Sequence, residues 1–191
     1  MESIRSQLLS RQREIRDPWL LGLFVDNEIH WGDLCYLARC TIMAPEDQAA
    51  KKAFVEVLNA KYGSIASLNA VWKTQFESWN ALLKNRDGVP SEADADLKSF
   101  NEAIIHRYYG NIRKAFDECA PGVLYMGCRF ASSASGSNAS VLAIGQQYCD
   151  VISYNIYCHE LYDFPFPEGY CKGNGSTCYR TEPAEPCQRE A

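Results

Sequence analysis

The stretch WLLGLFVDNE, residues 19–28, joins seven apolar or small residues directly to three polar ones. An apolar run without polar alternation is typical of a strand that is buried on both faces of a parallel sheet. Asp17 and Pro18 precede it and end a polar helical segment over 3–16, because proline disfavours helical backbone in the residue before it. We therefore expect a buried strand over 19–25. Its polar C-terminal end is where parallel α/β folds place ligand-binding and catalytic groups.

Helical and strand patterns alternate along the following residues. They predict helices over 45–58, 64–69, 95–119 and 141–148, and further strands over 123–128 and 151–157. Pro45 suits the first turn of a helix, and Gly63 can take the left-handed conformation that ends one. Strands that alternate with helices are typical of parallel α/β proteins, which is the fold class that we expect.

The last part of the chain lacks this order. From residue 164 onward there is no apolar run and little periodicity, and the segment holds three of the nine cysteines. We expect one folded domain over 1–163, followed by an irregular or disordered tail over 164–191.

Composition excludes several classes of partner. Apolar residues make up 47% and charged residues 23% of the 191 positions, as in ordinary globular proteins. The formal net charge of −5 gives no basic footprint for nucleic acid or an anionic membrane surface. No apolar run approaches the roughly 20 residues that span a bilayer. The first 16 residues carry four arginines and no apolar core, so they are not a secretory signal.

The nine cysteines do not form a recognisable metal motif. The sequence has no C-x-x-C pair, and its three histidines complete no cluster at zinc spacing. We therefore expect no metal site and no cofactor. Six cysteines lie among apolar residues or at the ends of elements, where small buried thiols are the simplest expectation: Cys35, Cys40, Cys119, Cys128, Cys149 and Cys158.

Asp26, Asn27 and Glu28 form the strongest candidate for chemistry. A carboxyl group at the open end of a buried strand stands in a partly desolvated cleft, which favours its protonated form and suits a general acid. A neighbouring amide can bind a ligand hydroxyl. The plainer alternatives are that Glu28 caps the next segment or pairs with an arginine.

Two blocks carry a resemblance to known enzymes. LGLFVDNEIHW, residues 21–31, resembles the fourth strand of clan A glycoside hydrolases, which ends in Asn-Glu. KYGSIASLNAVWKTQF, residues 61–76, is similar to a segment shared by glycoside hydrolase families 42 and 50. Lys73 stands where these families usually carry glycine.

Two later blocks narrow the resemblance to one of these families. LYMGCRFA, residues 124–131, and YCDVISYNIY, residues 148–157, look most like the fifth and sixth strands of family 50, the β-agarases. The likeness covers roughly residues 10–163. It implies a partial (β/α)₈ barrel that holds strands four to six and their helices.

The resemblance also implies roles for individual residues. Glu28 would be the acid/base of a retaining glycosidase, and Asn27 would bind the sugar 2-hydroxyl. The remaining implied roles are sugar contacts by Arg129 and Asn155, positioning of the nucleophile by Tyr154, and stacking of Trp31 on a sugar face. The implied substrate is a galactose-containing polysaccharide or oligosaccharide, with no nucleic-acid or membrane partner.

The partner nucleophile is missing from the expected place. The family carries it on the seventh strand, in a Gly-Glu-Phe type motif after an apolar run, but residues 170–176 here read YCKGNGS. Glu160 and Glu168 lack such a lead-in. We therefore expect a fragment or a frame-shifted product, whose first three strands and true N-terminus lie upstream.

Three alternatives remain open. A family 42-like β-galactosidase would fit residues 61–76 equally well. A carbohydrate-binding remnant would keep Asn27 and the aromatic residues without turnover, as the missing nucleophile suggests. An incomplete barrel with unpaired strand edges could also be inactive and prone to self-association.

Overall fold

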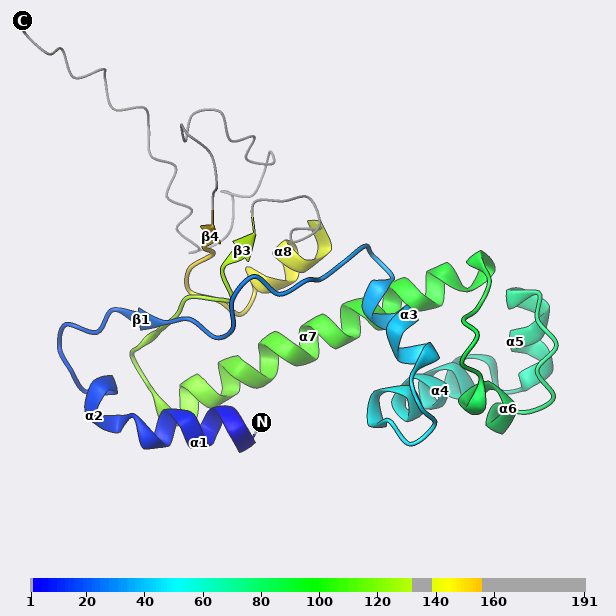
Figure 1. The fold of residues 1–191 in the computed structure, drawn as a ribbon, viewed down its shortest axis with the longest axis horizontal. Coiled ribbons are helices and arrows are strands. Elements are labelled where there is room, and N and C mark those ends of the chain that lie inside the picture. The colour runs from blue at the N-terminus through cyan, green and yellow to red at the C-terminus, as the bar shows by residue number, and fades with distance from the viewer. Residues whose placement is uncertain (1, 132–138, 156–191) are drawn as a thin grey trace, which may run out of the picture. The chain divides into compact units, whose positions relative to one another are not determined.

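The structure is a computed structural model, and it describes residues 2–131 and 139–155. Figure 1 shows the order of its elements. They are α1 (Glu2–Ser10), α2 (Gln12–Ile15), β1 (Gly22–Leu23), α3 (Tyr36–Met43), α4 (Ala49–Tyr62), α5 (Ile65–Trp72), α6 (Trp79–Lys84), the 3₁₀ helix η1 (Ser91–Ala93), α7 (Asp94–Cys119), β2 (Leu124–Tyr125), β3 (Phe130–Ala131), α8 (Ala139–Gly145) and β4 (Tyr154–Asn155).

The chain divides into two compact units. We call Met1–His30 with His106–Ala191 the strand unit, and Trp31–Ile105 the helical unit. Helix α7 begins in the helical unit and ends in the strand unit. None of the helices in the described ranges combines the length and apolarity that a membrane span requires. The fold is a mostly helical α/β structure.

The strand unit holds two parallel strand pairs. β1 pairs with β2, with Gly22 opposite Leu124, and β3 pairs with β4, with Phe130 opposite Tyr154. A Cβ on Gly22 would lie 2.7 Å from the Leu124 carbonyl oxygen, so glycine allows this close approach of the two strands. The parallel pairing of the predicted strands 19–25 and 123–128 is therefore confirmed.

The strands are shorter and more exposed than the sequence predicts. The predicted burial of residues 19–25 on both faces is wrong, because Trp19 is 92% exposed and Leu21 is 68% exposed. Asp17 holds Trp19 and Leu20 in a turn, with its Oδ1 accepting from the Trp19 N–H at 2.9 Å. Among the described residues, β1 has a partner strand on one side only. A strand in a two-stranded pair leaves apolar side chains in contact with solvent.

Most predicted helices are confirmed with shifted ends. The predicted helix 95–119 is α7, and the segment 3–16 is split into α1 and α2. Helix α4 begins later and ends later than predicted, and Gly63 closes it with φ of 71°. The Ser64 hydroxyl then caps α5 by accepting the Ser67 N–H at 3.1 Å.

Helix α3 was not predicted. Its first amides are satisfied by a side chain far away in the sequence, since Asn101 Oδ1 accepts the N–H of Leu37 at 2.9 Å and that of Ala38 at 3.4 Å. Asp33 Oδ1 accepts the Cys35 N–H at 2.8 Å just before the helix. The residue at the N-cap position, Cys35, makes no side-chain cap hydrogen bond, so the usual sequence signal of a helix start is absent there.

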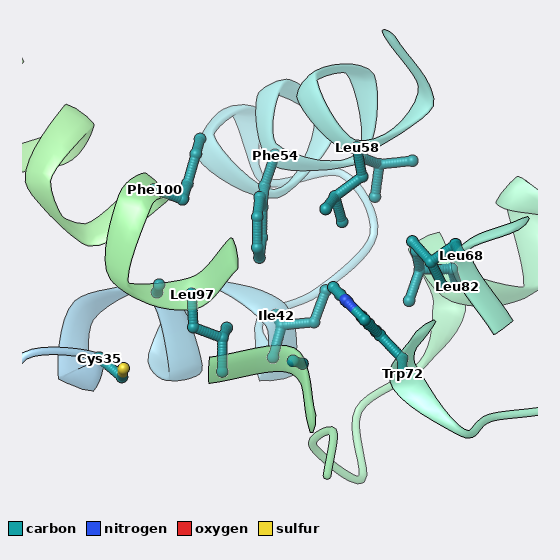
Figure 2. Packing of buried hydrophobic residues seen from close by; sticks show 12 residues of the cluster. Cys35, Ile42, Phe54, Leu58, Leu68, Trp72, Leu82, Leu97 and Phe100 are labelled. Atoms are coloured by element: carbon teal, nitrogen blue, oxygen red, sulfur yellow. The ribbon is translucent and has the colours of Figure 1, made fainter. Parts of the chain in front are cut away.

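The helical unit has its own apolar core, shown in Figure 2. The rings of Phe54 and Phe100 stack with their centroids 4.2 Å apart. Trp72 is fully buried, and Trp79 packs at the edge of the same cluster. Both tryptophans therefore contribute to the packing of the helical unit.

Asp96 is a buried carboxylate that ties this core together. Its oxygens accept from Lys61 Nζ at 2.5 Å, Tyr62 Oη at 2.7 Å and Trp72 Nε1 at 2.8 Å. Burial raises the pKa of Asp96, but the three donors outweigh burial and leave the pKa below its ordinary value.

Tyrosine rings and thiols pack in the interior of the strand unit. Tyr125 is fully buried, and its ring centroid lies 5.0 Å from that of Phe116. Burial raises the pKa of the Cys149 thiol to about 12, which keeps that thiol protonated and unreactive.

The expectation of buried thiols has a mixed outcome. It is confirmed for Cys35, Cys119, Cys128 and Cys149, which are buried. It is wrong for Cys40, because this residue lies on the exposed face of α3. Cys158 lies outside the described residues.

Candidate functional site

The turn that follows β1 has an unusual backbone. Asp26 has φ of 64° and Glu28 has φ of 51°, so two left-handed residues flank Asn27. Asp adopts this region more readily than most side chains, whereas Glu carries a cost of roughly 1 kcal/mol. Such a conformation persists only where the surrounding structure holds it in place.

Backbone hydrogen bonds hold the turn against the segment after β2. The Val25 N–H donates to the Gly127 carbonyl oxygen at 3.0 Å, which extends the pairing beyond β1. The Glu28 N–H donates to the carbonyl oxygens of both Cys128 and Arg129, at 3.1 and 3.0 Å. Glu28 is thus fixed to the adjacent chain through its own amide.

Asn155 reaches the turn from β4. Its Nδ2 lies 2.7 Å from Glu28 Oε1 and 3.4 Å from Asn27 Oδ1. Both partners are oxygen acceptors, so the amide nitrogen is the group that faces them. Glu28 and Asn155 are half-buried, and Asn27 is exposed. Three predicted site residues from two distant segments therefore meet at one place.

Arg129 accepts the Glu28 amide through its backbone carbonyl, and its side chain contacts Phe24. It has φ of 43°, and its guanidinium carbon lies 5.0 Å from the ring centroid of Phe24. A guanidinium at this distance from an aromatic ring makes a cation–π contact. Its Nε is buried, and no acceptor for it lies among the described residues. Phe24, which holds this side chain, is 41% exposed.

Tyr108 of α7 is a site residue that the sequence did not reveal. Its hydroxyl donates to Asp26 Oδ2 at 2.7 Å. Burial raises the pKa of the Tyr108 hydroxyl, and the bond to Asp26 raises it further, so the group remains a donor at neutral pH. In the sequence, Tyr108 belongs to the apolar pattern of a long helix, which gives no sign of this contact.

Tyr154 and Trp31 are the two remaining predicted site residues. The backbone of Tyr154 lies in β4 opposite Phe130, next to Asn155. Trp31 belongs to the helical unit and is only 3% exposed. The stacking of Trp31 on a sugar face stays a prediction.

The second carboxylate of a glycosidase is not assigned by the described residues. Glu160 and Glu168, the two glutamates considered for that role, lie outside the described residues, as does the tail 164–191. In residues 2–131 and 139–155, no three His, Cys, Asp or Glu side chains come together in the way that a metal ion requires.

Comparison with known proteins shows that the chain is similar to β-agarases in sequence and in structure. No protein-family model matches the chain. The chain is 30% identical over 155 residues to β-agarase B of Vibrio sp. (strain JT0107), covering 76% of this chain and 16% of that protein. It is also 30% identical over 163 residues to β-agarase A of the same strain, covering 78% and 16%.

Solved structures agree with this result. The crystal structure of the agarase AgWH50C matches with a TM-score of 0.73 and 32% identity, over 82% of this chain and 23% of that chain. An exo-β-agarase structure matches with a TM-score of 0.71 and 29% identity, over 80% and 22%. The chain spans about one sixth of the length of the curated relatives that it matches. It is homologous to a segment of the β-agarases.

Proposed function

We propose that this chain is part of a glycoside hydrolase that cleaves agarose-type, galactose-containing polysaccharide. The proposal is supported by the homology to β-agarases together with one observation of geometry. Glu28 lies in the turn that follows the parallel strand β1, with Asn27 beside it in sequence and the Asn155 amide nitrogen 2.7 Å from its carboxylate. A carboxyl group held by amides at a strand end is suited to proton transfer at a glycosidic oxygen.

Glu28 is the acid/base in this proposal. It protonates the oxygen of the leaving sugar and later takes a proton from the water that attacks the sugar–enzyme intermediate. Asn27 is exposed beside it and binds the 2-hydroxyl group of the sugar. The nucleophile is a second carboxylate about 5–5.5 Å from Glu28, as retaining enzymes require.

Arg129 and Tyr154 complete the proposed sugar site. The guanidinium of Arg129, which has five N–H donors, is proposed to donate to a hydroxyl oxygen of the sugar. The Phe24 ring fixes the direction of the guanidinium. Tyr154, next to Asn155 in β4, is proposed to orient the nucleophile. The larger fold around these residues is proposed to be a (β/α)₈ barrel, in which β1 belongs to strand four, β2 and β3 to strand five, and β4 to strand six.

Product analysis tests the proposal. The protein is incubated with agaro-oligosaccharides and, separately, with an aryl β-galactoside, and the products are separated by chromatography. Shortened agaro-oligosaccharides whose anomeric configuration is retained in proton NMR are expected. Cleavage of the aryl galactoside alone would instead indicate a β-galactosidase, and inverted products would exclude the retaining mechanism.

A carbohydrate-binding protein without turnover is the second candidate. It is favoured by the sequence YCKGNGS at 170–176, where an apolar strand with a Gly-Glu motif was expected. Calorimetric titration with agaro-oligosaccharides separates the two candidates. Heat of binding without product formation would support the second candidate and contradict the first.

A further inference from the structure

The left-handed residue Asp26 connects the candidate acid/base to helix α7. The Asp26 carboxylate accepts from the Tyr108 hydroxyl at 2.7 Å, although the two residues are far apart in the sequence. Asp26 is two residues before Glu28, and its φ of 64° sets the direction in which the chain continues to Glu28. Nothing in the reaction itself requires a tyrosine at this place.

Three independent anchors hold the turn. The Glu28 amide is fixed by two carbonyl groups, the Glu28 carboxylate accepts from Asn155, and the Asp26 carboxylate accepts from Tyr108. The first two anchors act on Glu28 directly. The third acts on Asp26, two residues before Glu28, and its donor comes from helix α7.

We infer that Tyr108 is a positioning residue for Glu28. The hydroxyl holds the Asp26 carboxylate, the carboxylate holds Asp26 in the left-handed region, and this backbone directs Glu28 toward Asn155. Tyr108 does not touch the substrate in this arrangement. The inference rests on the proposed function for its catalytic consequence, but its geometric part concerns the molecule without sugar.

The geometric part predicts how variants behave. Tyr108→Phe removes the hydroxyl and keeps the ring in place. Without the hydroxyl donor, the left-handed conformation of Asp26 loses a stabilising contact. Glu28 is then expected to move away from Asn155. Asp26→Gly should not require Tyr108, because glycine takes a positive φ without steric cost. Asp26→Ala should disturb the turn, since alanine lacks both the carboxylate and the conformational freedom.

The experiment reads the side-chain amide of Asn155 by NMR in the ¹⁵N-labelled protein, without ligand. The signal is assigned by its loss in Asn155→Ala. Tyr108→Phe is expected to shift or broaden it, and Tyr148→Phe is the matched control. Tyr148 is a tyrosine of the same unit whose hydroxyl contacts His106 Nδ1 at 3.0 Å, so its variant is expected to leave the Asn155 signal unchanged.

If Tyr108→Phe does not fold, the two Asp26 variants test the inference in its place. Asp26→Gly is expected to preserve the Asn155 signal, and Asp26→Ala to move it. In the Asp26→Gly background, adding Tyr108→Phe is expected to change nothing further. An unchanged Asn155 signal in Tyr108→Phe, or an equal change in Tyr148→Phe, overturns the inference. So does an equal response to Asp26→Gly and Asp26→Ala.

Kinetics provide the second readout. With agaro-oligosaccharides, Tyr108→Phe is expected to lower kcat by about tenfold while KM changes less than about twofold, because a misdirected acid affects the transition state more than substrate binding. Absence of hydrolysis by the unmodified protein would contradict the proposed function. The NMR comparison would then still decide whether Tyr108 positions Glu28.

Discussion

Asn155 donates a hydrogen bond from its side-chain amide to Glu28 across 127 residues of sequence, with Nδ2 and Oε1 2.7 Å apart. The bond joins the turn after β1 to β4, and these two strands belong to different parallel pairs. It places an amide on the carboxylate that we propose as the acid/base. The same nitrogen lies 3.4 Å from Asn27 Oδ1, so Asn155 fixes both members of the Asn-Glu pair.

Replacing Asn155 is expected to impair turnover. Asn155→Ala removes the donor and should lower kcat by about tenfold or more, because Glu28 loses its orientation. Asn155→Asp should be worse, since a second carboxylate at this distance repels the first. Steady-state hydrolysis of agaro-oligosaccharides measures both variants. Asn59→Ala, on the exposed side of α4, is the control and should leave kcat unchanged; equal losses in all three variants would contradict the assigned role.

Asp96 is expected to control the stability of the helical unit. Asp96→Asn leaves Lys61, Tyr62 and Trp72 facing a neutral amide, and it should lower the free energy of unfolding by about 2–3 kcal/mol. Glu92→Gln, at an exposed position of η1, is the matched control and should have little effect. Urea denaturation followed by circular dichroism gives both values. A change below about 0.5 kcal/mol in Asp96→Asn would show that its hydrogen bonds contribute little.

Asp96 is also expected to make the stability of the folded protein depend on pH. The pKa of Asp96 is lower in the folded protein than in the unfolded chain, so the unfolded chain takes up a proton first as pH falls. Its stabilising contribution is therefore complete above about pH 4 and is lost as pH falls through the lowered folded value. Urea denaturation from pH 6 to pH 2 should show this loss in the unmodified protein and a flatter profile in Asp96→Asn. Parallel profiles would contradict the prediction.

Lys73 is expected to be a site where substitution stabilises the chain. It follows α5 with φ of 57° and ψ of 39°, which is the left-handed conformation that glycine adopts at helix ends. Lys73→Gly should raise the free energy of unfolding by up to about 1 kcal/mol, because it removes the steric cost of a side chain there. Lys84→Gly, at the end of helix α6, should instead destabilise. Thermal melts of the two variants compare them, and a lower melting temperature for Lys73→Gly would refute the reasoning.

Local patterns predicted much of the fold. The length of α7, the cap at Gly63 and the parallel pairing of the two apolar runs follow from periodicity, glycine and burial. Helix α3 could not be predicted, because its N-terminal amides depend on Asn101 of another helix. The predicted strand over 123–128 ends early because Gly127 and Arg129 both have positive φ, and the chain resumes pairing with β4 only at Phe130.

The candidate site was predictable only where a local sequence pattern marks it. Asn27 and Glu28 stand at the end of an apolar run, which sequence reasoning can find. Their contact with Asn155 required the resemblance to a family, because no local pattern connects residues so far apart. Tyr108 was missed since a tyrosine on an apolar helix face usually packs, and its hydroxyl finds Asp26 only in the folded chain.

The comparison of Glu28→Gln with the unmodified protein tests the central claim most directly. Glutamine keeps the size of the side chain but cannot transfer a proton. Initial rates on agaro-oligosaccharides, whose leaving groups are poor, should fall by at least about 10²-fold, and aryl galactosides with good leaving groups should lose much less. Near-normal hydrolysis of agaro-oligosaccharides by Glu28→Gln would remove Glu28 from the role of acid/base.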